Sequence, residues 1–553
     1  MKRLIPTLSI VLAATALASS SHSSGDARTR GLNTITSDDI AAHVRVLASD
    51  EYEGRMPATR GEEKTLAYIT ERFRSFGISP QPNASYLQEV PLVKKSIDAE
   101  ATRLVVAGQG KETTLVLGEN MTAKTGGAVE RVTVARSELV FGGFGIVAED
   151  LGWNDYAGVD VTGKTVVLLI QDPRGAADSL YFKGRALSHY GTGIHKSETA
   201  ARKGARGVIF IHDQDAIGYP FAAIAANAKR PSFERVRGPE SAPIPEFTAT
   251  ISKDLAAEMF ASAGQDLATL TEAASRKGFR ARPVGLSLSG EIATELEYST
   301  SHNVVGYIPG RDRPDEFVVY TAHWDHVGIG AAVDGDSIYN GAVDNATGTA
   351  ALLELAQAYR ALPDAPSRSV VFIATAAEEQ GLLGAYHYAD HPVFPLANTI
   401  AVINMDALFP FGEFNGMTVV ALGSSELEEY MEAAASELGR KLQTDPSPEF
   451  GAFFRSDHYP FAKKGVPAIF AVGGPLDTPE PSAEMLERFN TYMSAGYHHP
   501  EDEYRDDWDL SGVTGDVKIY FLTGYAIAND TRVPNWYPDS EFRALRDRQR
   551  EAR

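Results

Sequence analysis

The segment FVVYTAH, residues 317–323, is a short run of β-branched and aromatic residues that ends in a histidine. Three similar runs follow it along the chain: SVVFIATA at 369–376, TIAVINMD at 399–406 and VPAIFAVGG at 466–474. Continuous apolar runs of this length are typical of strands that are buried on both faces. Helical patterns separate them at 346–362 and 424–440. We therefore predict an α/β fold in which a mixed central sheet is covered by helices on both faces.

The size and charge of the chain limit its organisation and its partners. Its 553 residues, 43% hydrophobic and 23% charged, exceed one typical domain, so at least two packed units are expected. The net charge of -21 would repel phosphate backbones and anionic membrane surfaces, which argues against nucleic acid as a partner. The chain has no cysteine, so any metal site must use His, Asp and Glu, and no lipidated cysteine can anchor it to a membrane.

The first 18 residues are typical of a secretory signal peptide. Lys2 and Arg3 precede an apolar run at residues 4–17, and the small residues at 16–18 fit a cleavage site. The apolar run is shorter than the roughly 20 residues that a bilayer span requires. The sequence therefore predicts a periplasmic or secreted protein without a membrane anchor.

Changes in pattern along the chain predict its division into domains. Two helices are expected within 36–77, and short β-rich runs follow to residue 134. Strand, helix and strand patterns then form a smaller α/β module of their own. The predicted boundaries are 1–18 for the signal peptide, 36–134 for the N-terminal part of the main domain, 135–290 for an inserted module, 291–535 for the rest of the main domain and 536–553 for a charged tail.

The stretch GVDVTGKT, residues 158–165, matches the G-x-x-x-x-G-K-[ST] pattern of nucleotide-binding phosphate loops. Such a loop needs a strand before it and a helix after it, so that helical N–H groups face the phosphate. Here the apolar run VVLLI follows directly at 166–170, which indicates a turn leading into a strand. We therefore predict that Lys164 does not bind ATP.

Polar residues follow the predicted strands, where α/β folds place their sites. His323 and Asp325 follow the first strand, the Glu378-Glu379 pair follows the second, and Asp406 ends the third. Each has an ordinary alternative, because a lone histidine is more often a core or capping residue and paired acids are usually solvated. An acid two residues from a histidine can instead orient the imidazole toward a metal.

Two further candidates lie in loops. Asp344 occurs in GAVDNATG, where an N-cap of the following helix is the alternative reading. His498 occurs in YHHPEDEY, which could simply be a polar turn. An acid such as Asp406 after an apolar strand is costly unless something positive compensates it, and a cation would do so.

Taken together, these motifs resemble those of the co-catalytic zinc peptidases of the M28 aminopeptidase family. The ordered series is His323-Trp324-Asp325, Gly341 to Gly348, Glu378-Glu379, Asn404-Met405-Asp406, Ser456-Asp457-His458 and Tyr497 to Asp502. The resemblance implies a zinc aminopeptidase-like fold, and it suggests that the insertion at 135–290 is a protease-associated domain.

The resemblance also implies a role for each site residue. Asp344 would bridge two Zn²⁺ ions, His323 and Asp406 would complete one site, and Glu379 and His498 the other. Glu378 would be the general base toward a bridging water, and Asp325 would orient His323. The family often has a cis peptide after its bridging aspartate, which here is the Asp344-Asn345 bond. His499 is left out, because the family's ligand comes first after the tyrosine.

One position departs from the family pattern and leaves the substrate class open. Some members have a tyrosine three residues before S-D-H, whereas this chain has Phe453, which cannot donate a hydrogen bond. His458 is a candidate substitute donor, and Arg455 is a candidate for binding a substrate carboxylate. An aminopeptidase acting on peptides is the first expectation. A carboxypeptidase or dipeptidase is the alternative, and a noncatalytic receptor-like protein is a third reading.

Overall fold

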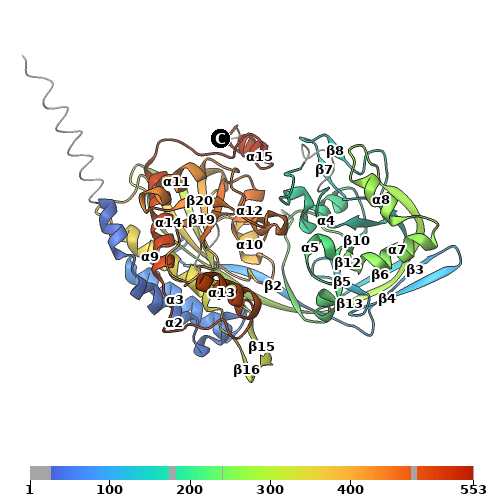
Figure 1. Ribbon diagram of the computed structural model, residues 1–553, viewed down its shortest axis with the longest axis horizontal. Helices are drawn as coiled ribbons and strands as arrows, with labels where there is room; N and C mark the ends of the chain where they lie inside the picture. The colour runs from blue at the N-terminus through green and yellow to red at the C-terminus, as the bar shows by residue number, and fades with distance from the viewer. Residues whose placement is uncertain (1–26, 174–181, 240, 475–482, 552–553) are drawn as a thin grey trace, which may run out of the picture. The chain divides into compact units, whose positions relative to one another are not determined.

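The computed structural model describes residues 27–173, 182–239, 241–474 and 483–551. The chain divides into two compact units. Unit 1 consists of Met1–Val90, Ser301–Asp445 and Ser456–Arg553, and unit 2 of Pro91–Thr300 and Pro446–Arg455. Figure 1 shows the elements of each unit along the colour gradient. The predicted signal peptide lies outside the described residues.

Unit 1 is built on a mixed sheet. Its strands are β1 (Ser79–Pro80), the end of β13 (Arg282–Ile308), β14 (Arg313–His323), β17 (Arg368–Thr375), β18 (Thr399–Asn404), β19 (Gly416–Val419), β20 (Lys441–Thr444) and β21 (Ala468–Gly473). Strand β14 lies between β17 and β18 and is parallel to both, and β18 is parallel to β21. Strand β13 pairs antiparallel with β17, and β19 pairs antiparallel with β21. Four parallel strands therefore end at one edge of the sheet.

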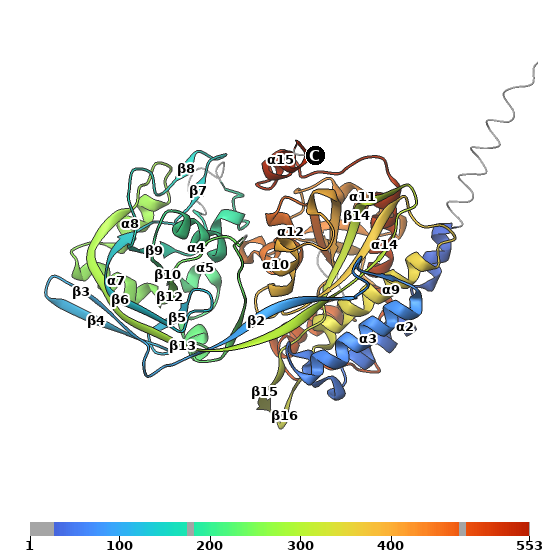
Figure 2. The same ribbon diagram turned by 180° about the vertical axis from the view of Figure 1, so that it is seen from behind.

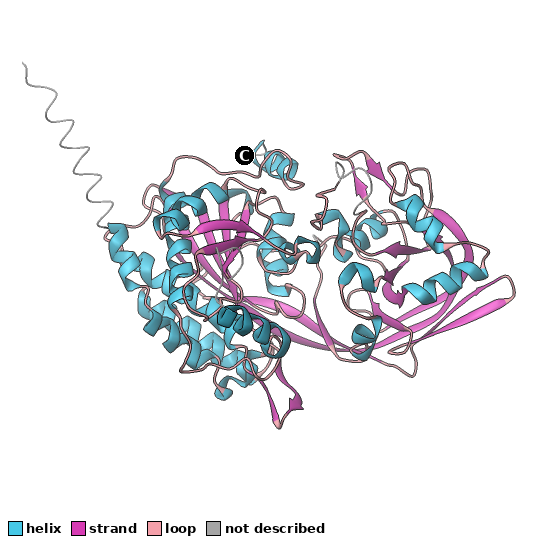
Figure 3. Ribbon diagram, in the orientation of Figure 1, coloured by secondary structure: helices cyan, strands magenta, loops and turns pink. Residues whose placement is uncertain are grey.

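Helices flank this sheet, as the colouring by secondary structure shows (Figure 3). The main helices of unit 1 are α2 (Ser37–Leu47), α3 (Arg60–Phe76), α9 (Gly348–Arg360), α10 (Leu383–Asp390), α11 (Leu427–Glu437), α12 (His458–Lys463), α13 (Ala483–Thr491), α14 (Ser511–Asn529) and α15 (Arg543–Glu551). Helices α9 and α14 lie on one side of the strands, and α10 and α12 lie on the other (Figures 1 and 2). No helix in the described part of the chain is both long and apolar enough to span a bilayer.

The strands and helices predicted for unit 1 are confirmed within a few residues. Every residue of β17 and β18 is buried, as their continuous apolar sequences require for strands covered on both faces. The two N-terminal helices are present, and α3 ends at Gly77. That residue has a φ of 72°, a left-handed conformation in which glycine avoids the strain of a side chain. The predicted α/β class with a mixed sheet is therefore confirmed.

Unit 2 is a second α/β structure with its own hydrophobic core. Its parallel strands are β6 (Arg131–Phe141), β9 (Thr165–Leu169), β10 (Gly207–His212) and β12 (Phe247–Ser252). Antiparallel strands β3 (Arg103–Gly108), β4 (Lys111–Val116), β5 (Met121–Thr125) and the first part of β13 extend them, and β2 (Leu87–Ile97) and β11 (Ser232–Arg235) pair with each other. Its main helices are α4 (Gly193–Arg202), α7 (Lys253–Ser262) and α8 (Leu267–Ala274).

The structural division between the units differs from the predicted boundaries at 134 and 290. Unit 2 begins at Pro91 and ends at Thr300, and it also takes in residues 446–455. The difference arises because β3 pairs with β13 and β5 pairs with β12, and both of these partners lie much later in the sequence. Segment 446–455 belongs to unit 2 through similar long-range contacts: the Leu187 N–H donates to the Pro448 carbonyl at 3.1 Å.

The C-terminal segment predicted as a charged tail is packed against unit 1. Trp536 is fully buried, and its indole N–H donates to the Gly465 carbonyl at 2.9 Å. Arg546 of α15 is also buried, and its guanidinium donates to the carbonyls of Leu396 and Thr399. The charged composition was misleading, because backbone carbonyls can satisfy a buried arginine.

The stretch 158–165 forms a turn that leads into a strand, as predicted. Gly163 has a left-handed φ of 70°, and β9 begins at Thr165. The Lys164 ammonium lies 2.9 Å from the Glu138 carboxylate. A helix N-terminus, which would present N–H groups to a phosphate, does not follow this lysine.

We predict that the wild-type protein shows no saturable ATP binding. Lys164→Ala removes one partly exposed ion pair, so it should change the melting temperature little and leave the expected peptidase activity intact. Calorimetric titration with ATP and Mg²⁺, before and after the substitution, tests this. Tight ATP binding that the substitution abolishes would contradict it.

Candidate metal centre

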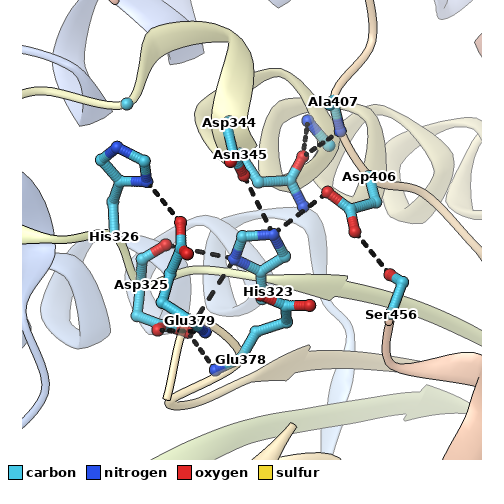
Figure 4. Close-up of polar contacts among 12 residues, drawn as sticks. His323, Asp325, His326, Asp344, Asn345, Glu378, Glu379, Asp406, Ala407 and Ser456 are labelled. Atoms are coloured by element: carbon cyan, nitrogen blue, oxygen red, sulfur yellow. Dashed lines mark hydrogen bonds and ion pairs between the residues drawn. The ribbon is translucent and has the colours of Figure 1, made fainter. Parts of the chain in front are cut away.

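The parallel strands of unit 1 bring the predicted residues to one edge of the sheet. His323 is the last residue of β14, Glu378 follows the end of β17 by three residues, and Asp406 follows the end of β18 by two. Because these strands are parallel neighbours, their carboxyl ends meet. Figure 4 shows the three side chains directed into the same space.

His323 lies between two carboxylates. Its Nε2 atom is 3.3 Å from Asp344 Oδ1 and 3.2 Å from Asp406 Oδ1. The imidazole is 1% exposed, so these contacts are shielded from solvent. One ligand atom from each of the three residues lies within 4.8 Å of the others, a spacing suited to a single ion.

The second carboxylate oxygen of Asp344 faces a different histidine. His498 Nε2 lies 3.2 Å from Asp344 Oδ2 and 3.0 Å from Glu379 Oε2. His498 is half-buried, with 39% of its side chain exposed, and it follows the short helical turn Tyr492–Gly496. Asp344 thus contacts one histidine through each of its two oxygens.

His326 is a further residue at this centre that the sequence analysis did not select. It is completely buried, and its Nδ1 lies 2.7 Å from Glu379 Oε1 (Figure 4). With Asp344 and Glu379 it forms a second group whose ligand atoms lie within 4.8 Å of one another. Within the described residues, its ring nitrogens have no hydrogen bond of normal geometry. Its position three residues after His323, in the stretch HWDH at 323–326, was the available signal.

The loop that carries Asp344 is held by side chains from distant segments. Asp502 accepts hydrogen bonds from the N–H groups of Val343, at 2.8 Å, and Asp344, at 3.0 Å. The Asn345 side-chain N–H donates to the Met405 carbonyl at 3.1 Å. The Asp344-Asn345 peptide bond is cis, as the resemblance implied. Asp502, 2% exposed, was quoted within a motif but given no role in the sequence analysis.

Asp325 contacts the segment that carries the two glutamates. Its carboxylate accepts from the N–H of Glu378 at 3.0 Å and from that of Glu379 at 3.4 Å. The nearest oxygen to His323 Nδ1 is the carbonyl of Asp325 at 3.1 Å, and its carboxylate is 3.9 Å away. Asp325 therefore links the ends of β14 and β17, in addition to contacting the histidine.

A chain of hydroxyl and amide groups orients Asp406. Thr321 donates to Asn404, the Asn404 amide donates to Ser456, and the Ser456 hydroxyl donates to Asp406 Oδ2, at 2.7, 2.7 and 2.5 Å. All three supporting residues are buried. The other oxygen of Asp406 remains directed at His323 (Figure 4).

The electrostatics show that the centre holds more negative charge than its surroundings accommodate. Burial by itself would lower the pKa of His498, but its contacts with Asp344 and Glu379 outweigh burial and raise it to about 10. Burial raises the pKa of Glu378 well above its usual value; the charge of His323 opposes this effect, and the carboxylates of Asp406 and Glu379 add to it. A buried group of carboxylates needs positive charge beside it, and the imidazole and carboxylate donors present here suit zinc.

The predicted substrate residues His458 and Arg455 differ in burial, and His499, which was not predicted as a ligand, lies apart from the centre. His458 is completely buried at the start of α12, with its ring centroid 5.3 Å from that of Phe470. Arg455 is exposed and belongs to segment 446–455 of unit 2. His499 is 47% exposed and pairs with Glu501 at 3.5 Å, separate from the two groups described above.

Comparison with known proteins identifies the segment that carries this centre. Residues 303–522 match the sequence model of Peptidase family M28. The chain is 32% identical over 161 residues to aminopeptidase NAALADL1 of Mus musculus, covering 28% of this chain and 20% of that protein. It is 29% identical over 205 residues to aminopeptidase YwaD of Bacillus subtilis, covering 37% and 40%. A glutamate carboxypeptidase 2 homolog of Caenorhabditis elegans is 30% identical over 203 residues, covering 35% and 24%.

The matched regions thus span well under two thirds of these relatives. Among solved structures, an aminopeptidase from Aneurinibacillus sp. strain AM-1 is 19% identical, covers 92% of this chain and 97% of that chain, and has a TM-score of 0.49. The sequence match at 303–522 includes all five proposed metal ligands and Glu378. The segment of the chain that carries the candidate centre is therefore similar to peptidase family M28.

Proposed function

We propose that this protein is an exported metallopeptidase that uses two Zn²⁺ ions to release N-terminal residues from peptides. The observation that carries the proposal is the position of Asp344, whose two oxygens contact His323 on one side and His498 on the other. A carboxylate shared in this way is suited to bridging two ions. Asp406 would complete one site and Glu379 the other. The alternative, a buried ion-pair network without metal, leaves the excess negative charge of the centre uncompensated.

Bound zinc supplies Lewis acidity and lowers the pKa of a water molecule, which makes hydrolysis possible near neutral pH. The protein's own contribution is to place a base beside that water. Glu378 would accept the proton and transfer it to the leaving amine. Its N–H is held by Asp325, so its backbone position is determined by the same residue that contacts His323.

The names of the matched relatives support peptide substrates, and they include both aminopeptidases and a carboxypeptidase homolog. We favour an aminopeptidase and retain the carboxypeptidase or dipeptidase alternative because Arg455 is exposed and could bind a substrate carboxylate. His458 is proposed to donate a hydrogen bond to the reacting carbonyl in place of the tyrosine that Phe453 replaces.

We also propose that unit 2 is a protease-associated domain and that the first 18 residues direct export. Unit 2 has a separate core and a parallel sheet with helices, which suits an inserted binding module. The site ligands proposed above all belong to unit 1. Peptide recognition by unit 2 would then modify substrate choice without contributing to the chemistry.

Blocked peptides distinguish the two substrate classes. For an aminopeptidase, we expect N-acetylation of a short peptide to abolish cleavage, because the free amine is part of what is recognised, and C-amidation to have little effect. Product analysis by mass spectrometry of the zinc-loaded protein tests this. The reverse pattern would favour a carboxypeptidase, and no cleavage of any peptide in a broad library would overturn the proposed activity.

The two neighbouring glutamates should differ in kind. Glu378→Gln should retain both zinc ions and bind substrate similarly, while kcat falls by roughly 100-fold to 10,000-fold, as for loss of a positioned base. Glu379→Gln, its matched control, should lose metal, because a neutral amide is a poorer ligand than a carboxylate. Metal content and kcat measured on both variants test the assignment. Metal loss in the Glu378 variant alone would show that the roles are exchanged.

The adjacent histidines provide a second matched pair. His498→Ala should reduce bound zinc toward one ion per chain and remove activity, because it deletes the only histidine proposed for the second ion. His499→Ala changes an exposed ring and should keep two ions and full activity. Elemental analysis after dialysis measures both. If His498→Ala keeps two tightly bound ions, the assignment is wrong, and His326 becomes the candidate ligand.

A further inference from the structure

Arg55, which lies at the end of the short helical segment Asp50–Arg55, is buried beside the proposed metal centre. Its guanidinium donates four hydrogen bonds, all to backbone carbonyls. Nε donates to Trp324 at 2.8 Å, Nη2 donates to Gly341 at 2.7 Å, and Nη1 donates to Leu47 at 2.8 Å and Asn340 at 2.5 Å. Arg55 forms no ion pair with any described residue, so its role differs from that of an ordinary buried salt bridge.

Three of these carbonyls belong to the two loops that carry the proposed shared and first-site ligands. Trp324 lies between His323 and Asp325, and Gly341 directly precedes the helical turn that contains Asp344. A planar guanidinium with five N–H donors can fix several acceptors in one geometry. Arg55 thus connects the His323 segment to the Asp344 segment through hydrogen bonds to Trp324 and Gly341.

The chain between these loops is a hairpin that offers little support of its own. Strands β15 (Gly328–Val333) and β16 (Asp336–Tyr339) form a separate two-stranded sheet that projects from the rest of unit 1 (Figures 1 and 2). Residues 329–332 are exposed, and Ile329 is 63% exposed. An isolated hairpin of this kind is marginally stable in water. Arg55 donates hydrogen bonds to Trp324, before the hairpin, and to Asn340 and Gly341, after it, and so joins the two ends of the hairpin.

The backbone around Arg55 is shaped for this contact. Glu53, Gly54 and Arg55 all have left-handed φ values, of 51°, 65° and 54°. Two of them are not glycine, so the conformation is strained and must be held by its surroundings. A Cβ atom on Gly54 would overlap the Tyr339 carbonyl and lie 2.8 Å from the Gly328 carbonyl. The segment therefore packs directly against the base of the hairpin.

Arg55 also carries its charge into the acidic surroundings of the centre. Burial lowers the pKa of its guanidinium to about 10, and the longer-range charges of Asp502, Asp325, Asp344 and Glu379 oppose that effect. The group therefore stays protonated at neutral pH. A neutral residue could not replace it without leaving four buried carbonyls short of donors.

We propose that Arg55 is a positioning residue that sets the spacing between His323 and Asp344. Its hydrogen bonds at the base of the hairpin, and not the β15–β16 hairpin itself, would hold the two proposed ligands at the distance that the metal site needs. The proposal rests on the proposed metal site. It predicts that the planar set of N–H donors on the guanidinium contributes more to zinc binding than its positive charge does, because the contacts are to neutral carbonyls.

Arg55→Lys tests this, since it keeps the charge and loses the planar fork. Arg546→Lys is the control, because Arg546 is equally buried and also donates to backbone carbonyls, at the opposite end of β18. We expect Arg55→Lys to weaken zinc binding by about 10-fold to 100-fold, as for loss of an outer partner of a ligand, and to alter the visible spectrum of the Co²⁺-substituted protein. The Arg546 variant should lose comparable thermal stability with unchanged metal affinity.

A second measurement keeps the two proposals separate. In the metal-free proteins, amide hydrogen exchange at residues 322–327 and 340–347 should rise in Arg55→Lys and stay unchanged in Arg546→Lys. Equal exchange in both variants would overturn the positioning role, whether or not zinc binds. A wild type that binds no zinc would overturn the proposed function alone.

A third variant covers the case in which Arg55→Lys does not fold. Replacing residues 330–337 by Asn-Gly joins Ile329 to Ile338, which are already paired across the hairpin, through a two-residue turn. If Arg55 sets the spacing, this shortened protein should bind zinc as the wild type does and show unchanged exchange in the two loops. Loss of zinc binding or faster exchange would show that the hairpin itself sets the spacing.

Discussion

The concentration of carboxylates at the end of four parallel strands is the constraint on which the rest of unit 1 depends. Asp344, Glu379 and Asp406 converge there, and Asp325 and Asp502 are buried close by. Like charges at short range in a poorly solvated place are unfavourable unless positive groups or N–H donors compensate them. The loops and strand ends around these carboxylates supply the compensating imidazoles, N–H groups and hydroxyls, or hold those groups in position.

Compensation comes in two layers. Imidazoles contact the carboxylate oxygens that face the centre, whereas backbone N–H groups and hydroxyls donate to carboxylate oxygens directed away from it. Asp502 accepts from the loop of Asp344, and Ser456 donates to Asp406. The outer layer comes from segments far apart in the sequence, so the geometry of the centre depends on the folding of the whole unit. Arg55 extends this layer to carbonyl groups, and thereby connects the N-terminal segment to both ligand loops.

Unit 2 obeys a different constraint. Its core is a conventional apolar one, formed by the parallel strands and the helices beside them, and it takes residues 446–455 from between two parts of unit 1. The first residue after that segment is Ser456, which supports Asp406. The chain that leaves unit 2 therefore enters the supporting layer of the metal centre directly.

The sequence by itself determined the class of fold and the residues of the candidate centre. Long apolar runs such as 317–323 can be buried only in a covered sheet, and the residues at their ends must then meet at one edge. His323, Asp344, Glu379, Asp406 and His498 were selected in this way, and with the help of the family resemblance, and the structure brings them together. These features are local, because they depend on the pattern within each strand and on the residue that follows it.

The tertiary structure alone decided what depends on contacts between distant segments. Strand pairing placed the start of unit 2 at Pro91, because β3 and β5 pair with strands more than a hundred residues away. Burial of Trp536 and Arg546 turned an expected tail into a packed segment. His326 and Arg55 were not selected from sequence. The position of His326 near His323 indicated proximity to the centre, but neither residue's sequence neighbours show which groups its side chain contacts. Their roles follow from which carboxylates and carbonyls the fold brings within reach, and that is a property of the folded chain.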